Sequence, residues 1–181
     1  MWQMIPTPLD MIFSDIDAAF QAGLPYMAIA VSLTIPDICA ACETNPPWTN
    51  EKRYVAWCEA YVAPKINHFT GKDCYRIRCG VLHQGRFGRH GDRYDRVIFT
   101  YANSGVHGGY ILMTHPQHGT IKVLPLHTPI FCKAMVDGAL QWREEKKDDR
   151  VVAQNIDNLV RKRPNGFEIA PGAHFRMPLI T

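Results

Sequence analysis

The sequence predicts a mainly α-helical protein, a helical bundle with a small antiparallel β insertion of two or three strands. Apolar residues recur at helical spacing before residue 85 and again after residue 128. From about residue 93 to 126 the composition shifts to Tyr, Val, Ile and Phe, with Gly- and Pro-containing turns between the segments. With 181 residues, 46% of them hydrophobic, the chain suits one domain (1–181) with a sizeable core, which excludes a disordered chain.

Three helices are predicted before the first chemically interesting segment. Thr7 is a candidate N-cap for the first. The second starts at Pro25 and is apolar nearly all round, so we expect it to be buried and bent at Pro36. Its apolar stretch is shorter than the roughly 20 residues that span a bilayer, so no membrane segment is expected. Asn50 caps the third helix, which ends near Pro64.

The remaining elements follow from the same patterns. A fourth helix is expected from about Asp73 through His83. After the β insertion, the helical period returns at Thr128 in a long helix, and a last helix begins near Asp149. The tail, residues 165–181, contains Pro-Gly and a further Pro and is expected to form an extended C-terminal arm.

Charge and cysteine content narrow the cellular context. Twenty Lys and Arg against 17 Asp and Glu give a formal charge of +3, which by itself is too small to require a nucleic-acid partner. The N-terminus lacks the basic start and apolar run of a secretory signal. We therefore expect the six cysteines to be reduced and the protein to be cytoplasmic.

The fourth helix carries the most interpretable chemistry. Arg76 and His83 are seven residues apart and lie about 20° from each other on one face of a helix. Cys79 and His83, four apart, are neighbours on that face. Arg78 lies off the face, but its side chain is long enough to reach the imidazole. The helix therefore presents guanidinium groups and an imidazole together.

An Arg and a His together are suited to cleaving RNA. The reaction removes a proton from a 2′-hydroxyl, develops negative charge on the phosphorus centre and returns a proton to the leaving 5′-oxygen. A histidine can transfer either proton, and a guanidinium stabilises the charge, so the chemistry needs no metal ion. One imidazole does not easily serve both faces of an in-line reaction, which favours a symmetric homodimer.

At these residues the sequence resembles the HEPN (higher eukaryotes and prokaryotes nucleotide-binding) superfamily, whose hallmark is an Arg, four to six residues, and a His on a helix of a small bundle. Arg78 to His83 fits with four intervening residues and Arg76 to His83 with six. The sequence departs from the family at Cys79, where many members have Asn or another polar residue.

The resemblance implies an HEPN-like bundle and a metal-independent, cofactor-free endoribonuclease whose motifs meet in a homodimer cleft. His83 would be the general acid or base, Arg78 would bind the scissile phosphate, and Arg76 would be a second phosphate contact. It also implies a defence or toxin role, with RNA as substrate and an antitoxin or another protein as partner. The alternative is a non-catalytic module of the same fold that binds a nucleotide, RNA or protein.

A basic segment surrounds the motif. From Lys72 to Arg96 there are seven Lys and Arg against three Asp, a local excess of four. A glycine-containing loop with this charge is suited to following a phosphate backbone, with Tyr94 and Phe87 as stacking surfaces. The alternative is a solvated loop whose arginines pair with acids. The candidate substrate contacts beyond the motif are Cys79, Gln84, Arg86 and Arg89.

Asp37 follows Pro36 in the apolar second helix and is the natural acid for the motif, where it would orient Arg78 or His83. The alternative for Asp37 is a kink or a helix-end cap. The structural alternative is that Arg78 only pairs with a buried acid and His83 only caps its helix.

A zinc site is the remaining alternative. Cys39 and Cys42 have the spacing of half a zinc or redox site, which His115 and His118 would have to complete. A cysteine among alanines in a helix is more often a small core residue, so we expect no metal site.

Overall fold

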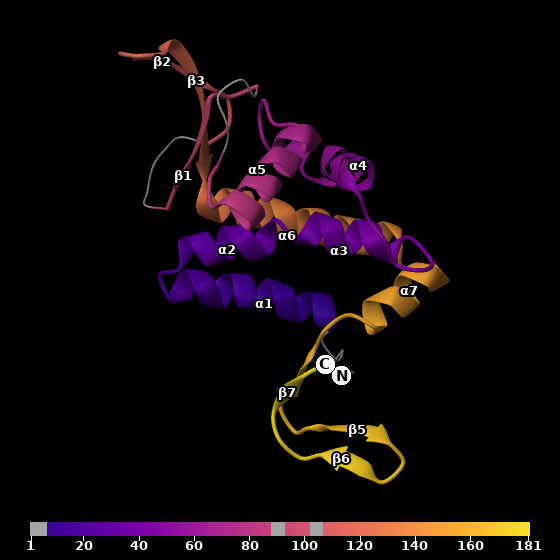
Figure 1. The fold of residues 1–181 in the computed structure, drawn as a ribbon. Coiled ribbons are helices and arrows are strands. Elements are labelled where there is room, and N and C mark those ends of the chain that lie inside the picture. Colours follow the sequence, from indigo (N-terminus) through magenta and orange to yellow (C-terminus); the bar gives the residue numbers. More distant parts are fainter. Residues whose placement is uncertain (1–6, 88–92, 102–106) are drawn as a thin grey trace.

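The computed structural model describes residues 7–87, 93–101 and 107–181. About 51% of the described residues are helical and 18% lie in strands, which form three small sheets. The expectation of a mainly helical bundle is therefore wrong, and the fold is mixed α/β (Figure 1). Part of the strand content comes from short segments that pair across 16 or more residues, and local periodicity does not reveal such pairing.

The elements follow one another as seven α-helices, one short 3-10 helix and seven strands within the described residues. The helices are α1 (Pro8–Gln21), α2 (Pro25–Ser32), α3 (Ile35–Cys42), α4 (Glu51–Tyr61), η1 (Ala63–Lys65), α5 (Gly71–Gln84), α6 (Thr128–Glu145) and α7 (Arg150–Asp157). The strands are β1 (Arg96–Thr100), β2 (Ile111–His115), β3 (Gly119–His127), β4 (Lys162–Arg163), β5 (Phe167–Ala170), β6 (Ala173–Phe175) and β7 (Leu179–Ile180).

The observed starts of α1 and α4 coincide with the predicted capping residues. Thr7 and Asp10 form a reciprocal capping box at the start of α1, and Asn50 accepts a hydrogen bond from the Arg53 amide at the start of α4. The second predicted helix is two helices, because the chain breaks after Ser32 rather than at Pro36. Pro36 lies in the first turn of α3, where its missing N–H costs no hydrogen bond.

The apolar pair α2 and α3 lies inside the fold. Residues 25–42 reach a mean hydropathy of 1.5 over 18 residues, enough by composition and length for a membrane span. Half of this segment is buried within the protein, and α3 contacts α4, α6 and α7. Residues 25–42 therefore form two helices that pack against other helices of the fold.

Helix α6 is the centre of the core. It contacts α2, α3, α4 and β3, and Phe131, Met135 and Trp142 are fully buried along it. At Gly138 a Cβ would lie 2.9 Å from the carbonyl oxygen of Tyr61, so α4 and α6 approach more closely than a larger residue permits. In Figure 1, α6 runs behind α2 and α3 and beneath α4 and α5.

The larger sheet is mixed rather than antiparallel. Its order is β1-β3-β2, with β1 parallel and β2 antiparallel to β3. The expectation of an antiparallel insertion is wrong for β1, because the chain after β1 passes to the opposite edge of β3 instead of turning back beside it. β3 leads directly into α6, and its Leu124 and Leu126 are buried against the core.

The C-terminal tail also differs from the predicted extended arm. β4 pairs with β7, and β5 pairs with β6 in an antiparallel hairpin beyond them. In Figure 1 this hairpin lies well away from the helices, at the end of a narrow neck. The turn residues that suggest an arm are the turns of a small β structure.

We predict that Asn155→Ala lowers the free energy of unfolding by about 1–3 kcal/mol, because two carbonyl groups lose their donor. The buried Asn155 amide donates to the Cys42 and Thr44 carbonyl oxygens, at 2.9 and 2.8 Å, and so ties α7 to the end of α3. Gln154→Ala, an exposed change on the same helix, is the control and should cost less than about 0.5 kcal/mol. Urea denaturation measures both, and equal losses would contradict the role of Asn155.

Candidate functional site

Helix α5 carries the candidate site, and both of its ends are defined by local sequence. Thr70 and Asp73 form a capping box at its start. Gly71 allows close packing on α4, because a Cβ there would lie 2.2 Å from the Val55 carbonyl oxygen. Gly85 ends the helix in the left-handed conformation, with φ +64°. The motif is therefore held on a rigid helix packed on α4.

Asp37, Arg78 and His83 form a continuous chain of contacts. Arg78 Nε donates to Asp37 Oδ2 at 2.9 Å, and Arg78 Nη1 lies 3.0 Å from His83 Nε2. A guanidinium only donates, so Nε2 of His83 accepts and the neutral imidazole in this contact carries its proton on Nδ1. Asp37 thus orients Arg78 from α3, and Arg78 in turn orients His83.

Burial differs along this chain. The side chains of Asp37 and Arg78 are 20% and 22% exposed, whereas His83 is exposed at the end of α5. An ion pair at this depth is less screened by solvent than a surface pair. The charged anchor therefore lies inside the protein, while the group that would exchange protons faces solvent.

The pKa shifts of the ion pair reflect burial and attraction together. Burial raises the pKa of Asp37 more than the charge of Arg78 lowers it. Burial lowers the pKa of Arg78, but the charge of and hydrogen bond to Asp37 outweigh this effect and raise it. The raised pKa of Asp37, taken alone, favours the neutral carboxyl group. The raised pKa of Arg78 favours the charged guanidinium. At neutral pH both groups are charged, because an arginine does not deprotonate in proteins and holds the carboxylate at hydrogen-bond distance.

Cys79 and Tyr75 border the Arg78 guanidinium. Cys79 is partly exposed, and its thiol contributes to raising the pKa of Arg78. Burial raises the pKa of Tyr75, and a hydrogen bond with Cys79 raises it further. Tyr75 packs edge-on against Tyr54, with 5.4 Å between the ring centroids. Sequence reasoning missed Tyr75, although its position three residues before Arg78 on a helix could have indicated it.

The other candidate contacts have different surroundings. Arg76 is half-buried on α5. Gln84 and Arg86 are exposed and bind each other, with Arg86 Nε donating to Gln84 Oε1 at 2.7 Å. Arg89 lies outside the described residues. Gln84 and Arg86 therefore belong to the exposed surface beside His83. Arg76 lies in the middle of α5.

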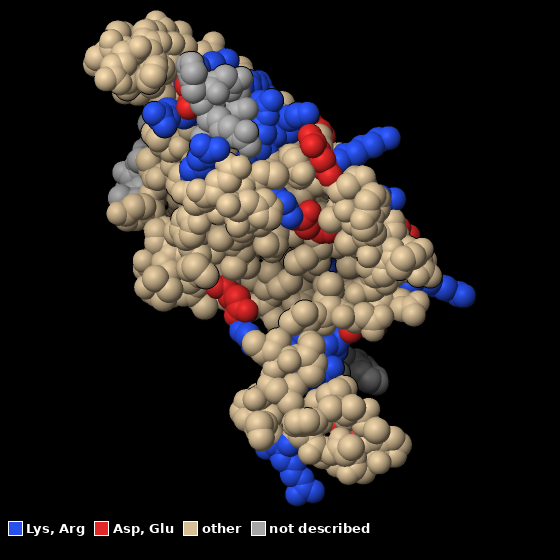
Figure 2. All heavy atoms as spheres, in the orientation of Figure 1, with Lys and Arg blue, Asp and Glu red and all other residues tan. Residues whose placement is uncertain are grey.

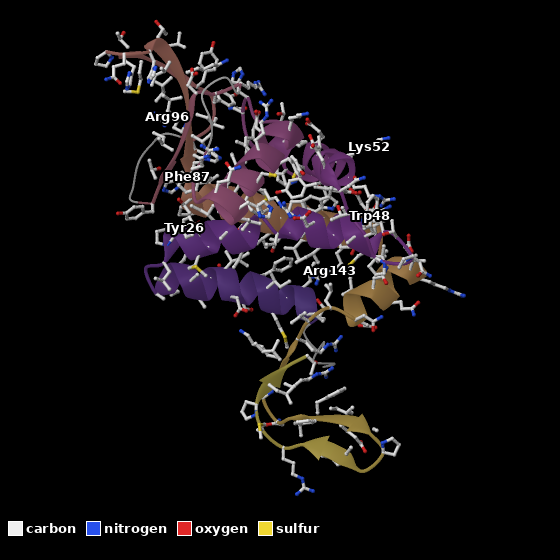
Figure 3. All side chains as sticks on the ribbon, viewed as in Figure 1. Tyr26, Trp48, Lys52, Phe87, Arg96 and Arg143 are labelled. Atoms are coloured by element: carbon white, nitrogen blue, oxygen red, sulfur yellow. The ribbon has the colours of Figure 1, made fainter. Side chains whose placement is uncertain are left out.

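The basic segment is partly neutralised, as the alternative interpretation expects. Lys72 pairs with Glu51 at 3.2 Å, and Arg93 pairs with Asp73 at 2.8 Å. Arg96 is exposed at the start of β1 (Figure 3). In Figure 2, Lys and Arg side chains still gather at the end of the molecule that carries the β1–β3 sheet.

The two proposed stacking residues do not serve that purpose. Tyr94 is 3% exposed and its hydroxyl donates to the His68 carbonyl oxygen. Phe87 packs between Tyr26 and Phe99, with ring centroids 6.3 and 5.0 Å away (Figure 3). The expectation of stacking surfaces at these positions is wrong, because both rings are core contacts that join the sheet to the helices.

Tyr110 is an exposed ring in this region, as is Tyr101 directly after β1. Tyr110 is 47% exposed, with Lys122 Nζ 4.0 Å from its ring centroid and the His68 ring 5.9 Å away, edge-on. An exposed aromatic ring beside a cation is the arrangement that stacks nucleobases. Sequence reasoning missed Tyr110, because no sequence signal distinguishes it from the buried Tyr94.

The structure offers no support for a zinc site. Cys39 and Cys42 are buried in α3, and burial raises the pKa of Cys42 to about 11. His115 and His118 stack on each other at the β2–β3 turn, with centroids 4.6 Å apart, far from α3 in Figure 1. Among the described residues, no three His, Cys, Asp or Glu are grouped as metal ligands. All six cysteines are free thiols.

We predict that Asp37→Ala lowers the free energy of unfolding at pH 7 by about 1–3 kcal/mol, because the half-buried guanidinium of Arg78 loses its charged partner. Lys133→Ala removes the exposed pair with Asp137 and should cost less than about 0.5 kcal/mol. Urea denaturation measures both changes. If Asp37→Ala costs no more than Lys133→Ala, the ion pair does not hold α3 to α5.

No protein family, no curated protein and no solved structure matches this chain. The function is therefore inferred from the residues of the site and their geometry.

Proposed function

We propose that the protein is a metal-independent endoribonuclease, as the HEPN resemblance of the Arg78 and His83 spacing implies. The observation that carries the proposal is the contact chain in which Asp37 anchors Arg78 and Arg78 contacts an exposed His83. The resemblance is proposed for the chemistry of this site only. The helical bundle that the resemblance also implies is not part of the proposal.

Arg78 is suited to binding the scissile phosphate. A guanidinium has five N–H donors, and the contacts with Asp37 and His83 do not exhaust them. A non-bridging phosphate oxygen would replace His83 at Nη1, while Nε stays on Asp37 and keeps the group oriented. The charge that develops on the phosphorus centre would then meet a preorganised cation.

His83 is suited to moving the protons. When phosphate takes its place on Arg78, the Nε2 lone pair becomes available to accept the proton of the 2′-hydroxyl. The 2′-oxygen then forms a bond to phosphorus as the bond to the 5′-oxygen breaks, and the leaving oxygen takes up a proton. The products are a 2′,3′-cyclic phosphate and a 5′-hydroxyl.

A second copy of the chain completes the proposal. Attack and departure occur on opposite sides of phosphorus, so one imidazole transfers one of the two protons. We assign the other to His83 of a second copy in a homodimer. Within the same proposal the protein is cytoplasmic, has a defence or toxin role, and is controlled by an antitoxin or another protein partner.

The second candidate function is non-catalytic binding of RNA or a nucleotide. The observation that favours it is the ion pair itself, because a guanidinium held by Asp37 is stably placed whether or not any bond is broken. The exposed Tyr110 beside Lys122 serves binding equally well. The two functions differ in whether RNA is cut.

We predict that the purified protein cleaves RNA in EDTA and leaves 2′,3′-cyclic phosphate ends. His83→Ala and Arg78→Ala should each reduce the rate by at least about 100-fold, since each removes a proton-transfer or charge-stabilising group. Gel electrophoresis of end-labelled structured and unstructured RNA measures cleavage, and circular dichroism checks that the variants fold.

The matched controls are His174→Ala and Arg150→Ala, which remove an imidazole and an exposed guanidinium from the C-terminal hairpin and from α7. Both should cleave at the parent rate. No cleavage by the parent, or cleavage that survives both site substitutions, would contradict the enzyme. Retained RNA binding without cleavage would indicate the second candidate.

Subunit complementation tests the two-copy site. If His83 of two chains act on one phosphate, mixing excess His83→Ala with limiting parent protein should lower the activity of the parent below its dilution-corrected value. Parent activity that stays proportional to parent chains would show that each chain cleaves alone. His174→Ala, mixed in the same excess, is the control and should leave parent activity unchanged.

A further inference from the structure

A hollow lies between the end of α3, helix α4 and the end of α6. Its volume is about 500 Å³, which is within the range of small-molecule sites. Three small side chains line it and leave this space between the helices: Ala40 of α3, and Ala56 and Ala60 of α4. The hollow is therefore large enough for a compact ligand of one or two rings.

Two aromatic rings belong to the wall of the hollow. Trp57 and Tyr61 are one turn apart on α4, and their ring centroids lie 5.1 Å apart. Trp57 is 4% exposed, and its indole N–H is buried without a hydrogen-bond partner among the described residues. An unpaired buried donor is uncommon in a folded protein. This wall therefore combines apolar ring surface with a donor that no other described residue uses.

Cations border the other end of the hollow. Lys52 and Arg53 line it from the first turn of α4, and in the described part of the chain neither forms an ion pair with an acidic side chain. Arg53 Nη1 donates to the Ala40 carbonyl oxygen at 3.5 Å, a weak contact that leaves most of the five guanidinium donors unused. Asn50 accepts from the Arg53 amide, and its Nδ2 group is a further donor at this end.

The acidic residue in the wall does not cancel these charges. Glu43 accepts a hydrogen bond from Trp142 Nε1 at 2.7 Å and lies 3.8 Å from Lys146 Nζ. Lys52, Arg53 and Lys146 against Glu43 give the lining a net charge of +2. A concave surface with charges of one sign concentrates their field, so the hollow attracts anions.

We propose that this hollow binds a nucleoside monophosphate. The phosphate lies against Lys52 and Arg53, because a guanidinium binds two phosphate oxygens through parallel N–H donors and an ammonium adds a point charge. The base lies further along α4, against Trp57 and Tyr61, whose rings favour a flat apolar ligand. These two residues are about 6 and 12 Å from Arg53 along the helix axis, so one nucleotide reaches from the cations to the rings.

Both ends of the hollow are needed to explain this choice of ligand. A phosphate ion alone leaves the aromatic wall without a partner, and an uncharged nucleoside leaves Lys52 and Arg53 unpaired. The hollow is also separate from the site on α5. Gly71 of α5 packs against the Val55 carbonyl oxygen of α4, whereas Arg53 and Trp57 lie on another face of that helix. The inference therefore goes beyond the proposed nuclease and holds whether or not RNA is cut.

Isothermal titration calorimetry of the full chain tests the inference with adenosine monophosphate (AMP), adenosine and inorganic phosphate as probes. AMP should bind with a Kd below about 1 mM. Adenosine and inorganic phosphate should each bind at least about tenfold more weakly, because each makes only part of the contacts. Tryptophan fluorescence should change as AMP binds, since Trp57 lines the hollow.

Two substitutions test the position of the ligand. Arg53→Gln should weaken AMP binding at least about tenfold, because the phosphate loses its guanidinium, and Arg150→Gln on α7 is the control. Ala56→Leu fills the hollow without removing a polar contact and should weaken binding to a similar extent. Ala153→Leu, another exposed alanine on a helix, should bind AMP like the parent. Circular dichroism checks that each variant folds.

Three results would overturn the inference: no binding of AMP up to about 5 mM, Arg53→Gln and Ala56→Leu proteins that bind AMP like the parent, or inorganic phosphate that binds as tightly as AMP. AMP binding that is lost in Arg78→Ala but kept in Arg53→Gln would place the ligand on α5, and this result also contradicts the inference. None of these measurements uses RNA, so their failure leaves the nuclease proposal untouched. Loss of cleavage in His83→Ala likewise leaves AMP binding in the hollow unchanged.

Discussion

Burial of α6 is the constraint on which the other elements depend. Its buried side chains, from Phe131 to Trp142, form one face that α2, α3, α4 and β3 contact, whereas Lys133, Gln141 and Glu144 are exposed on the other face. Gly138 lets α4 approach at backbone distance. Because α5 packs on α4 through Gly71, the position of α6 also determines where α5 and its Arg–His motif lie.

The candidate site is a consequence of this packing. α3 is held against α6, and Asp37 on α3 meets Arg78 on α5. The buried part of the site is an ion pair between two fixed helices, and its exposed part is a histidine at a helix end. Such an arrangement keeps the guanidinium oriented while the imidazole remains accessible, and the proposed phosphate chemistry depends on both.

The two ends of the molecule have different characters. The end with the β1–β3 sheet gathers cations and the exposed Tyr110, whereas the C-terminal hairpin carries exposed apolar side chains at the far end of a basic neck. Residues 158–181 have a net charge of +3 and α1 has a net charge of −3, so the two cancel within the overall charge of +3. The acidic and basic segments lie far apart in the sequence, and Lys162 of the basic segment pairs with Asp15 of α1.

The sequence by itself determined the features that depend on near neighbours. Capping residues such as Thr7 and Asn50 mark helix starts because their side chains bind amides two or three residues away. The Arg78 and His83 contact is also expected from the sequence, because both residues lie on one helix and the arginine side chain is long enough to reach the imidazole.

Only the tertiary structure decided the features that join distant segments. The parallel pairing of β1 with β3, the pairing of β4 with β7 and the mixed α/β class depend on where the chain goes between strands, which composition does not encode. The burial of Tyr94 and exposure of Tyr110 depend on which side of the sheet meets the helices. Asp37 could be suggested as the partner of Arg78, but only the packing of α3 near α5 brings its carboxylate within 2.9 Å, because 41 residues separate the two groups along the chain.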